Sequence, residues 1–174
     1  MHLRSHLGPA GPFPAGPPEP RLPDMLVDAD WVQAHLDDPD VVPVEVDHDA
    51  SAYDKGHLKG AVKLDWKQDL QDPRTCGFID EATFETLLSS QGIANDDTVI
   101  LYGGCNNWFA AWAYWYFKVY GHRSVRLLDG GREKWELGSR EMVTEVPHRP
   151  ATAYRARKPE RWIRMLIRTR TRGA

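Results

Sequence analysis

The chain has 174 residues, of which 41% are hydrophobic and 27% charged, so it suits one globular domain and is too short for two full ones. Its longest apolar run spans residues 108–117, well under the roughly 18 residues that cross a bilayer, which argues against a membrane protein. The net charge of −3 divides into −11 over residues 1–147 and +8 over residues 148–174, and an acidic body argues against a nucleic-acid-binding domain.

Both ends of the chain are expected to lie outside the fold, which places the domain at residues 25–147. Residues 1–24 hold seven prolines between Pro9 and Pro23 and no continuous apolar segment, a pattern that predicts a disordered leader without a secretion signal. Residues 148–174 are rich in Arg with little periodicity, so they are interpreted as a basic, irregular tail, a truncated linker. Removing residues 1–24 and 151–174 is expected to cost about 1 kcal/mol or less. The alternative is that the tail, through Tyr154 or Trp162, covers an apolar strip of the domain that a missing second domain would otherwise bury.

Helical and strand patterns alternate between these ends. In chain order they predict a helix capped by Asp28 or Asp30 and ending at Leu36, a strand at 41–46, a helix capped by Asp80 and ending near Gly92, a strand at 98–102, a loop at 103–107, a helix at 108–120, a strand at 125–128 and a helical turn holding Trp135. Trp108, Trp112 and Trp115 recur at helical spacing and are expected in the core. Strands alternating with helices imply parallel pairing with right-handed crossovers. The predicted fold class is α/β: a single domain with an open parallel sheet and helices on both faces.

The loop at residues 103–107 is the candidate binding site. In open α/β sheets, ligands bind beyond the carboxyl ends of the strands. The loop also precedes a helix, whose first N–H groups suit an anion or a thiolate, and two adjacent glycines let the backbone bend inward. Gly103, Gly104, Asn106 and Asn107 are therefore expected to form a substrate-binding loop, although Gly-rich loops of this kind also occur without a function.

Two segments resemble the signatures of the rhodanese family. Residues 53–61 (YDKGHLKGA) are similar to the first signature, with Lys59 where proline is usual, and residues 125–135 (VRLLDGGREKW) are similar to the second, from which they depart at Leu128, Arg132 and Lys134. The resemblance covers about residues 26–147. It is nearest to the first domain of bacterial tandem-domain thiosulfate sulfurtransferases, and it implies a rhodanese-like domain.

The resemblance also implies a chemistry. Rhodaneses carry sulfane sulfur from a small anionic donor such as thiosulfate as a cysteine persulfide, without a cofactor. In active members the cysteine directly follows the strand, where this chain has Gly103. The resemblance therefore implies the weakly active or inactive N-terminal half of a thiosulfate sulfurtransferase, whose partner would be a missing or separate catalytic rhodanese domain. The alternative is a non-catalytic rhodanese-like binding or scaffolding module.

Cys105 is the candidate catalytic residue, because Gly103 stands at the usual position of the cysteine. It lies two positions late in the loop but just before a helix, a place that activates thiols. It could carry a persulfide and react faster than Cys76, or be a chance cysteine where the family tends to have asparagine. The arginine that often closes active rhodanese loops is missing, and Ala111 stands where a dual-specificity phosphatase needs arginine.

The remaining candidate residues are given structural roles. His57 is expected to fix its turn inside the protein, and Cys76 to be an inert surface thiol. Glu45 and Asp47 end a strand near the loop, and their register against the family's acidic residue stays open. The two cysteines have no zinc-ligand spacing, so no metal site is expected, and they do not make a disulfide framework, so a cytoplasmic setting is expected.

Overall fold

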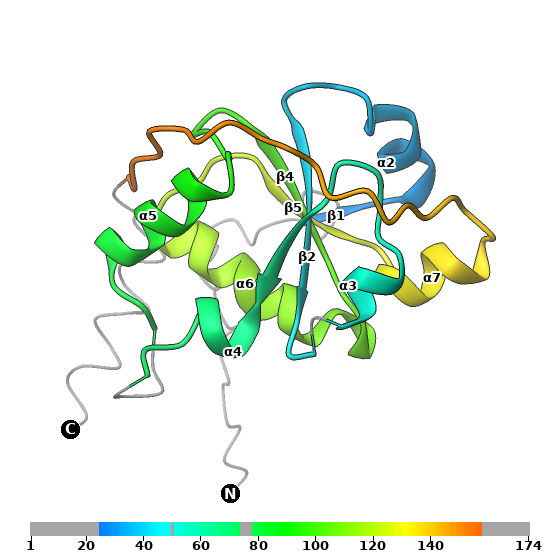
Figure 1. Cartoon of the computed structure of the whole chain (residues 1–174), viewed down its shortest axis with the longest axis horizontal. Helices are drawn as coiled ribbons and strands as arrows, with labels where there is room; N and C mark the ends of the chain where they lie inside the picture. The colour runs from blue at the N-terminus through cyan, green and yellow to red at the C-terminus, as the bar shows by residue number, and fades with distance from the viewer. Residues whose placement is uncertain (1–24, 50, 74–77, 158–174) are drawn as a thin grey trace, which may run out of the picture.

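The computed structural model describes residues 25–49, 51–73 and 78–157 (Figure 1). The expected leader, Cys76 and Trp162 lie outside these residues. Within them, none of the helices is both long and apolar enough to pass through a bilayer.

Five parallel strands form one open sheet. They are β1 (Leu26–Val27), β2 (Val41–Asp47), β3 (Val62–Asp65), β4 (Thr98–Tyr102) and β5 (Val125–Leu128), in the order β1-β5-β4-β2-β3. The three strands that the sequence predicted are confirmed. Two strands were not predicted: β1 has only two residues, and only two of the four residues of β3 are apolar, whereas β5 has three apolar residues in four. β4 lies at the centre, and the loop after it opens at the carboxyl edge of the sheet.

Helices cover both faces of the sheet, as predicted (Figure 1). They are α2 (Ala29–His35), α3 (Ser51–Lys55), α4 (Trp66–Asp69), α5 (Glu81–Ser90), α6 (Trp108–Val119) and α7 (Gly131–Leu137). Alternate side chains of β4 enter two different cores. Val99 and Leu101 pack with α5 and α6, whereas Ile100 and Tyr102 pack with α2, α3 and α7. Asp28 and Asp80 cap α2 and α5 as predicted, each accepting a backbone N–H three residues ahead.

The expectation that the three tryptophans of α6 belong to the core is wrong. Trp108, Trp112 and Trp115 are 72%, 37% and 42% exposed. The buried residues of this helix are Ala110, Ala113, Tyr114, Tyr116 and Phe117. A helix that is apolar all round has no polar side to fix its orientation, and alanines let it approach the sheet closely. The larger rings consequently lie outward.

The described start of the tail belongs to the fold, so the expectation that neither end contributes a core residue is also wrong. Tyr154 is 1% exposed and packs in the core with Phe84 of α5. The backbone around it is held by hydrogen bonds: Thr152 N donates to Ser89 O at 3.0 Å, and Tyr154 N donates to Ser89 Oγ at 3.0 Å. Figure 1 shows this segment, in orange, running past the end of α5. The alternative, that Tyr154 covers apolar residues of the domain, is the correct one.

His122 gives this packing a pH dependence. It is buried, with Nε2 2.9 Å from Asp97 O and Nδ1 3.2 Å from the Tyr154 hydroxyl. Burial lowers the pKa of His122 below its usual value, so the unfolded chain takes up a proton first as the pH falls. His122 should therefore reduce stability as the pH drops from about 6.5 toward the lowered pKa of the folded protein, by at most about 1.4 kcal/mol per pH unit.

Urea denaturation between pH 5 and 8 measures this slope. The slope should be shallower in His122→Gln, whose side-chain amide can still donate to Asp97 O. The matched variant His148→Gln changes an exposed histidine and should keep the wild-type slope. An unchanged slope in His122→Gln would contradict the assignment.

Candidate functional site

The loop after β4 is fixed from inside the protein, chiefly by Asn107. Its Oδ1 accepts the N–H of Gly103 at 3.0 Å, and its Nδ2 donates to Leu128 O, at the end of β5, at 2.6 Å. From the other side, the Arg132 N–H donates to Gly103 O at 3.0 Å. The loop that the sequence singled out is thus tied to the Asp-Gly-Gly segment that follows β5.

Gly103 occupies a place with no room for a side chain. A Cβ built there would lie 2.3 Å from the carbonyl oxygen of Val46 in the neighbouring strand β2. Because the obstacle is backbone, a rotamer change cannot relieve it. This is the position directly after β4, where the resemblance to rhodaneses places the sulfur-carrying cysteine.

Three N–H groups of the loop are satisfied within the protein. Gly103 donates to Asn107 Oδ1, Gly104 donates to Asp47 Oδ2 at 3.1 Å, and Asn107 donates to Gly104 O at 3.0 Å. The two glycines expected to present their N–H groups to an anion therefore present them to side chains of this chain. Cys105 and Asn106 form the exposed tip of the loop. Binding of substrate by this loop stays a prediction.

Cys105, Asn106 and Asn107 are consecutive residues in the left-handed region, with φ of 49°, 54° and 61°. This conformation costs roughly 1–2 kcal/mol for a residue with a Cβ, and asparagine tolerates it best. Such backbone is retained only where the surroundings enforce it, and it is common at functional sites. Here the side-chain hydrogen bonds of Asn107 hold the loop to the protein, and Cys105 is exposed.

His48 is a neighbour of Cys105 that the sequence analysis missed. Cys105 Sγ, a ring nitrogen of His48 and a carboxylate oxygen of Asp47 all lie within 4.8 Å of one another. His48 Nδ1 is 3.2 Å from Asp47 Oδ1. Asp47 is the last residue of β2, His48 follows it, and Cys105 lies in the loop after β4. Because β2 and β4 are parallel neighbours, their carboxyl ends meet, and that topology is the signal that could have found His48.

Glu45 and Asp47, left open by the sequence, have different roles. Asp47 accepts the Gly104 N–H of the loop, whereas Glu45 is buried with its Oε2 3.5 Å from Arg132 Nη1. Burial raises the pKa of Glu45, and the positive charge of Arg132 opposes that rise. Arg132 also donates to Gly56 O at 2.7 Å and to Ala52 O at 2.6 Å, so it links the two signature segments.

His57 has the structural role that was expected. It is fully buried, with Nδ1 2.9 Å from Tyr53 O and Nε2 3.0 Å from Glu145 O. Its ring also stacks on that of Tyr53, with 3.7 Å between the centroids. Both ring nitrogens are therefore engaged with backbone, away from the loop.

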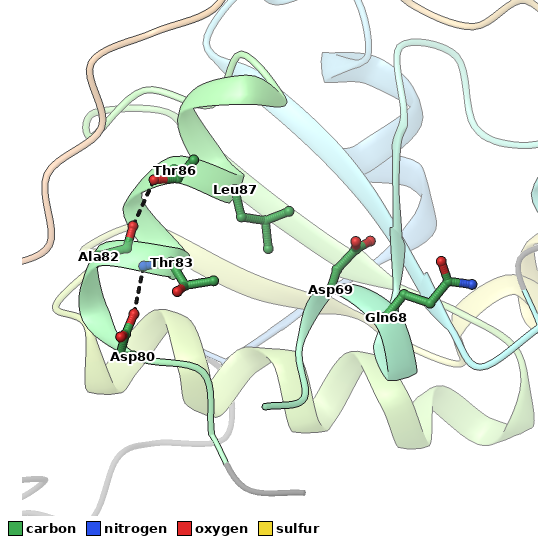
Figure 2. Close-up of a pocket in the computed structure, with 7 residues that line it drawn as sticks. All are labelled: Gln68, Asp69, Asp80, Ala82, Thr83, Thr86 and Leu87. Carbon is green, nitrogen blue, oxygen red and sulfur yellow. Dashed lines mark hydrogen bonds between the residues drawn. The ribbon is translucent and has the colours of Figure 1, made fainter. Parts of the chain in front are cut away.

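A hollow of about 430 Å³ lies away from this loop, between α4 and α5. Figure 2 shows Gln68 and Asp69 on one side and Asp80, Thr83 and Leu87 on the other. Its polar groups serve the local backbone: Asp80 caps α5, and Asp69 Oδ2 accepts the Asp65 N–H at 2.8 Å. None of the site residues predicted from the sequence lines it.

Taken together, the topology and the loop beyond β4 define an α/β domain of the rhodanese fold class. The SseA 3-mercaptopyruvate sulfotransferase of Escherichia coli, described as having the rhodanese fold, superposes with a TM-score of 0.71 at 22% identity. The match covers 86% of this chain and 63% of that one. A likeness at this identity establishes the fold alone.

The sequence establishes the family. The family of rhodanese-like domains matches residues 28–137, so the chain belongs to it. A protein of Mycolicibacterium smegmatis named "Putative thiosulfate sulfurtransferase" is 62% identical over 141 residues, which cover 81% of this chain and 51% of that protein. The sulfur carrier protein TtuD of Thermus thermophilus is 52% identical over 132 residues, 76% of this chain and 46% of that protein. The chain thus spans about half the length of these relatives.

Proposed function

We propose that this chain is the N-terminal half of a two-domain thiosulfate sulfurtransferase and transfers little or no sulfur by itself. The observation that carries the proposal is the backbone at Gly103, where a cysteine Cβ would overlap the Val46 carbonyl. The names of the half-matched relatives support thiosulfate, a small anionic sulfur donor, as the substrate of the complete enzyme. The residues of this chain then shape one wall of a site whose nucleophile belongs elsewhere.

The reaction requires a thiolate at the right place. A cysteine thiolate attacks the outer sulfur of thiosulfate, the S–S bond breaks and sulfite leaves. The resulting persulfide gives its terminal sulfur to cyanide, which forms thiocyanate and restores the thiolate. Cys105 is the one described thiol near the loop, and it lies at the exposed tip rather than directly after β4. The N–H groups of Gly103 and Gly104 are already engaged, so they would not hold a persulfide formed there.

The aromatic surface of α6 favours a second candidate function, that of a non-catalytic binding module. Trp108, Trp112 and Trp115 are exposed on it, and Phe78 stacks on Trp112 with 5.5 Å between the ring centroids. Large apolar side chains gathered on one surface are typical of an interface. The occupant that we propose is a catalytic rhodanese domain, because the relatives have about as many further residues as the match covers.

Thiosulfate:cyanide transfer by the purified chain should lie at the uncatalysed background, because position 103 excludes the nucleophile. Thiocyanate formation measures it, and Cys105→Ser should leave the rate unchanged, as should the matched variant Cys76→Ser. Robust turnover that Cys105→Ser abolishes and Cys76→Ser retains would refute the proposal. In a second experiment, the chain is mixed with the half of the Mycolicibacterium smegmatis relative that the match does not cover. A complex that Trp108→Ala weakens supports the proposed partner, and the absence of a complex refutes it.

A further inference from the structure

Three side chains with metal-binding atoms meet at the carboxyl edge of the sheet. Asp47 ends β2 and His48 follows it, whereas Cys105 comes from the loop after β4, 57 residues after His48. One carboxylate oxygen, one ring nitrogen and the thiol sulfur lie within 4.8 Å of one another. A zinc ion bound between these atoms would lie about 2.0–2.3 Å from each of them.

Neighbouring groups hold the ligands in place. Asp47 is nearly buried, its Oδ1 accepts the His48 N–H at 2.8 Å, and its Oδ2 accepts the Gly104 N–H at 3.1 Å. The His48 ring contacts Phe109, with 5.0 Å between the centroids. Hydrogen bonds to ligands from the surrounding protein orient them and raise metal affinity. The loop that carries Cys105 is held to the protein by the side-chain hydrogen bonds of Asn107, two residues away.

We propose that Asp47, His48 and Cys105 bind one zinc ion through a carboxylate oxygen, an imidazole nitrogen and a thiolate. Zinc accepts this mixture of oxygen, nitrogen and sulfur donors, and the thiolate disfavours magnesium and calcium. The two anionic ligands balance the charge of the ion, and binding releases the thiol proton to solvent. Three protein ligands leave the fourth tetrahedral position open to water or to a small sulfur anion.

This inference does not depend on the proposed function. A zinc-bound Cys105 is occupied as a ligand and is unavailable as a sulfur carrier, which is consistent with a chain that transfers little sulfur. The test measures metal binding alone, so its failure and the failure of the proposed function give different results. This site was not predicted, because Cys105 is far in sequence from the adjacent Asp47 and His48.

The test is calorimetric titration of the full chain, without an affinity tag, with zinc ions alone. One ion should bind per chain. Cys105→Ser and His48→Ala should each weaken binding by at least about 100-fold, because loss of a group that merely orients a ligand already weakens metal binding by up to about 100-fold. The matched variants Cys76→Ser and His148→Ala should bind as the wild type does. Asp47→Asn retains an oxygen for the Gly104 N–H and should weaken binding while the circular dichroism spectrum is unchanged.

A second measurement is independent of heat. Zinc should slow alkylation of Cys105 by iodoacetamide, and His48→Ala should remove that protection, as mass spectrometry of the Cys105 and Cys76 peptides would record. Absence of stoichiometric binding would overturn the proposal. So would binding that survives His48→Ala, or protection of Cys76 equal to that of Cys105.

Discussion

Replacing Arg132 by methionine is expected to lower the free energy of unfolding by about 3–5 kcal/mol, the usual cost of removing one partner of a buried ion pair. Arg132 is buried, and its guanidinium donates to Gly56 O in the first signature segment, to Ala52 O just before it and to Glu45. Without it, Glu45 loses its opposing charge and Gly56 O and Ala52 O lose their donor. Urea denaturation at pH 7 measures the loss.

The pH dependence identifies the cause. The pKa of Glu45 is already raised in the folded protein, chiefly by burial, and loss of Arg132 raises it further. The folded protein then keeps a proton that the unfolded chain releases, so stability is lost as the pH rises through the interval between the two pKa values. The deficit of Arg132→Met should therefore be larger at pH 8 than at pH 5, and Arg132→Met/Glu45→Gln should recover part of it.

An exposed ion pair is the control. Lys59, which also departs from its signature, pairs with Asp37 at 2.5 Å, and both side chains are largely exposed. Lys59→Met should cost less than about 1 kcal/mol. Equal losses of unfolding free energy in Arg132→Met and Lys59→Met would mean that the buried ion pair stabilises the protein no more than the exposed one.

Ending the chain at residue 150 is expected to cost about 3–5 kcal/mol, as for other large buried rings, because it removes Tyr154. The void would open between Phe84 and His122, whose rings contact Tyr154 at centroid distances of 5.9 and 5.8 Å. At about 4 °C per kcal/mol, Tm should fall by roughly 12 °C or more.

Two further variants separate the ring from the rest of the segment. Tyr154→Ala in the full chain should reproduce most of the loss, whereas Tyr154→Phe should cost about 1 kcal/mol for its contact with His122 Nδ1. A chain ending at Arg157 retains every contact described for Tyr154 and is the length control. If the chains ending at 150 and 157 melt together, Tyr154 does not support the fold.

The sequence predicted the elements whose patterns are local. β4 was correct to the residue because Thr98 and the four residues Val99 to Tyr102, all four buried, lie between Asp97 and Gly103 and suit a central strand buried on both faces. The loop was located by the same boundary. The orientation of α6 was not predictable, because its apolar residues surround the helix and the choice of inward face depends on the sheet. Tyr154 and His48 acquire their roles only from segments that are distant in sequence.

The contact between Gly103 and the Val46 carbonyl also bears on how this protein can change over evolutionary time. Two of the four glycine codons become a cysteine codon by a change of one nucleotide, so a thiol at this position is close in mutational terms. The product of that change would need the backbone of β2 to move, and β2 is hydrogen-bonded on both sides by β3 and β4. A cysteine at position 103 would therefore have to be accompanied by a change in β2, so a single substitution does not place a thiol there within the present backbone.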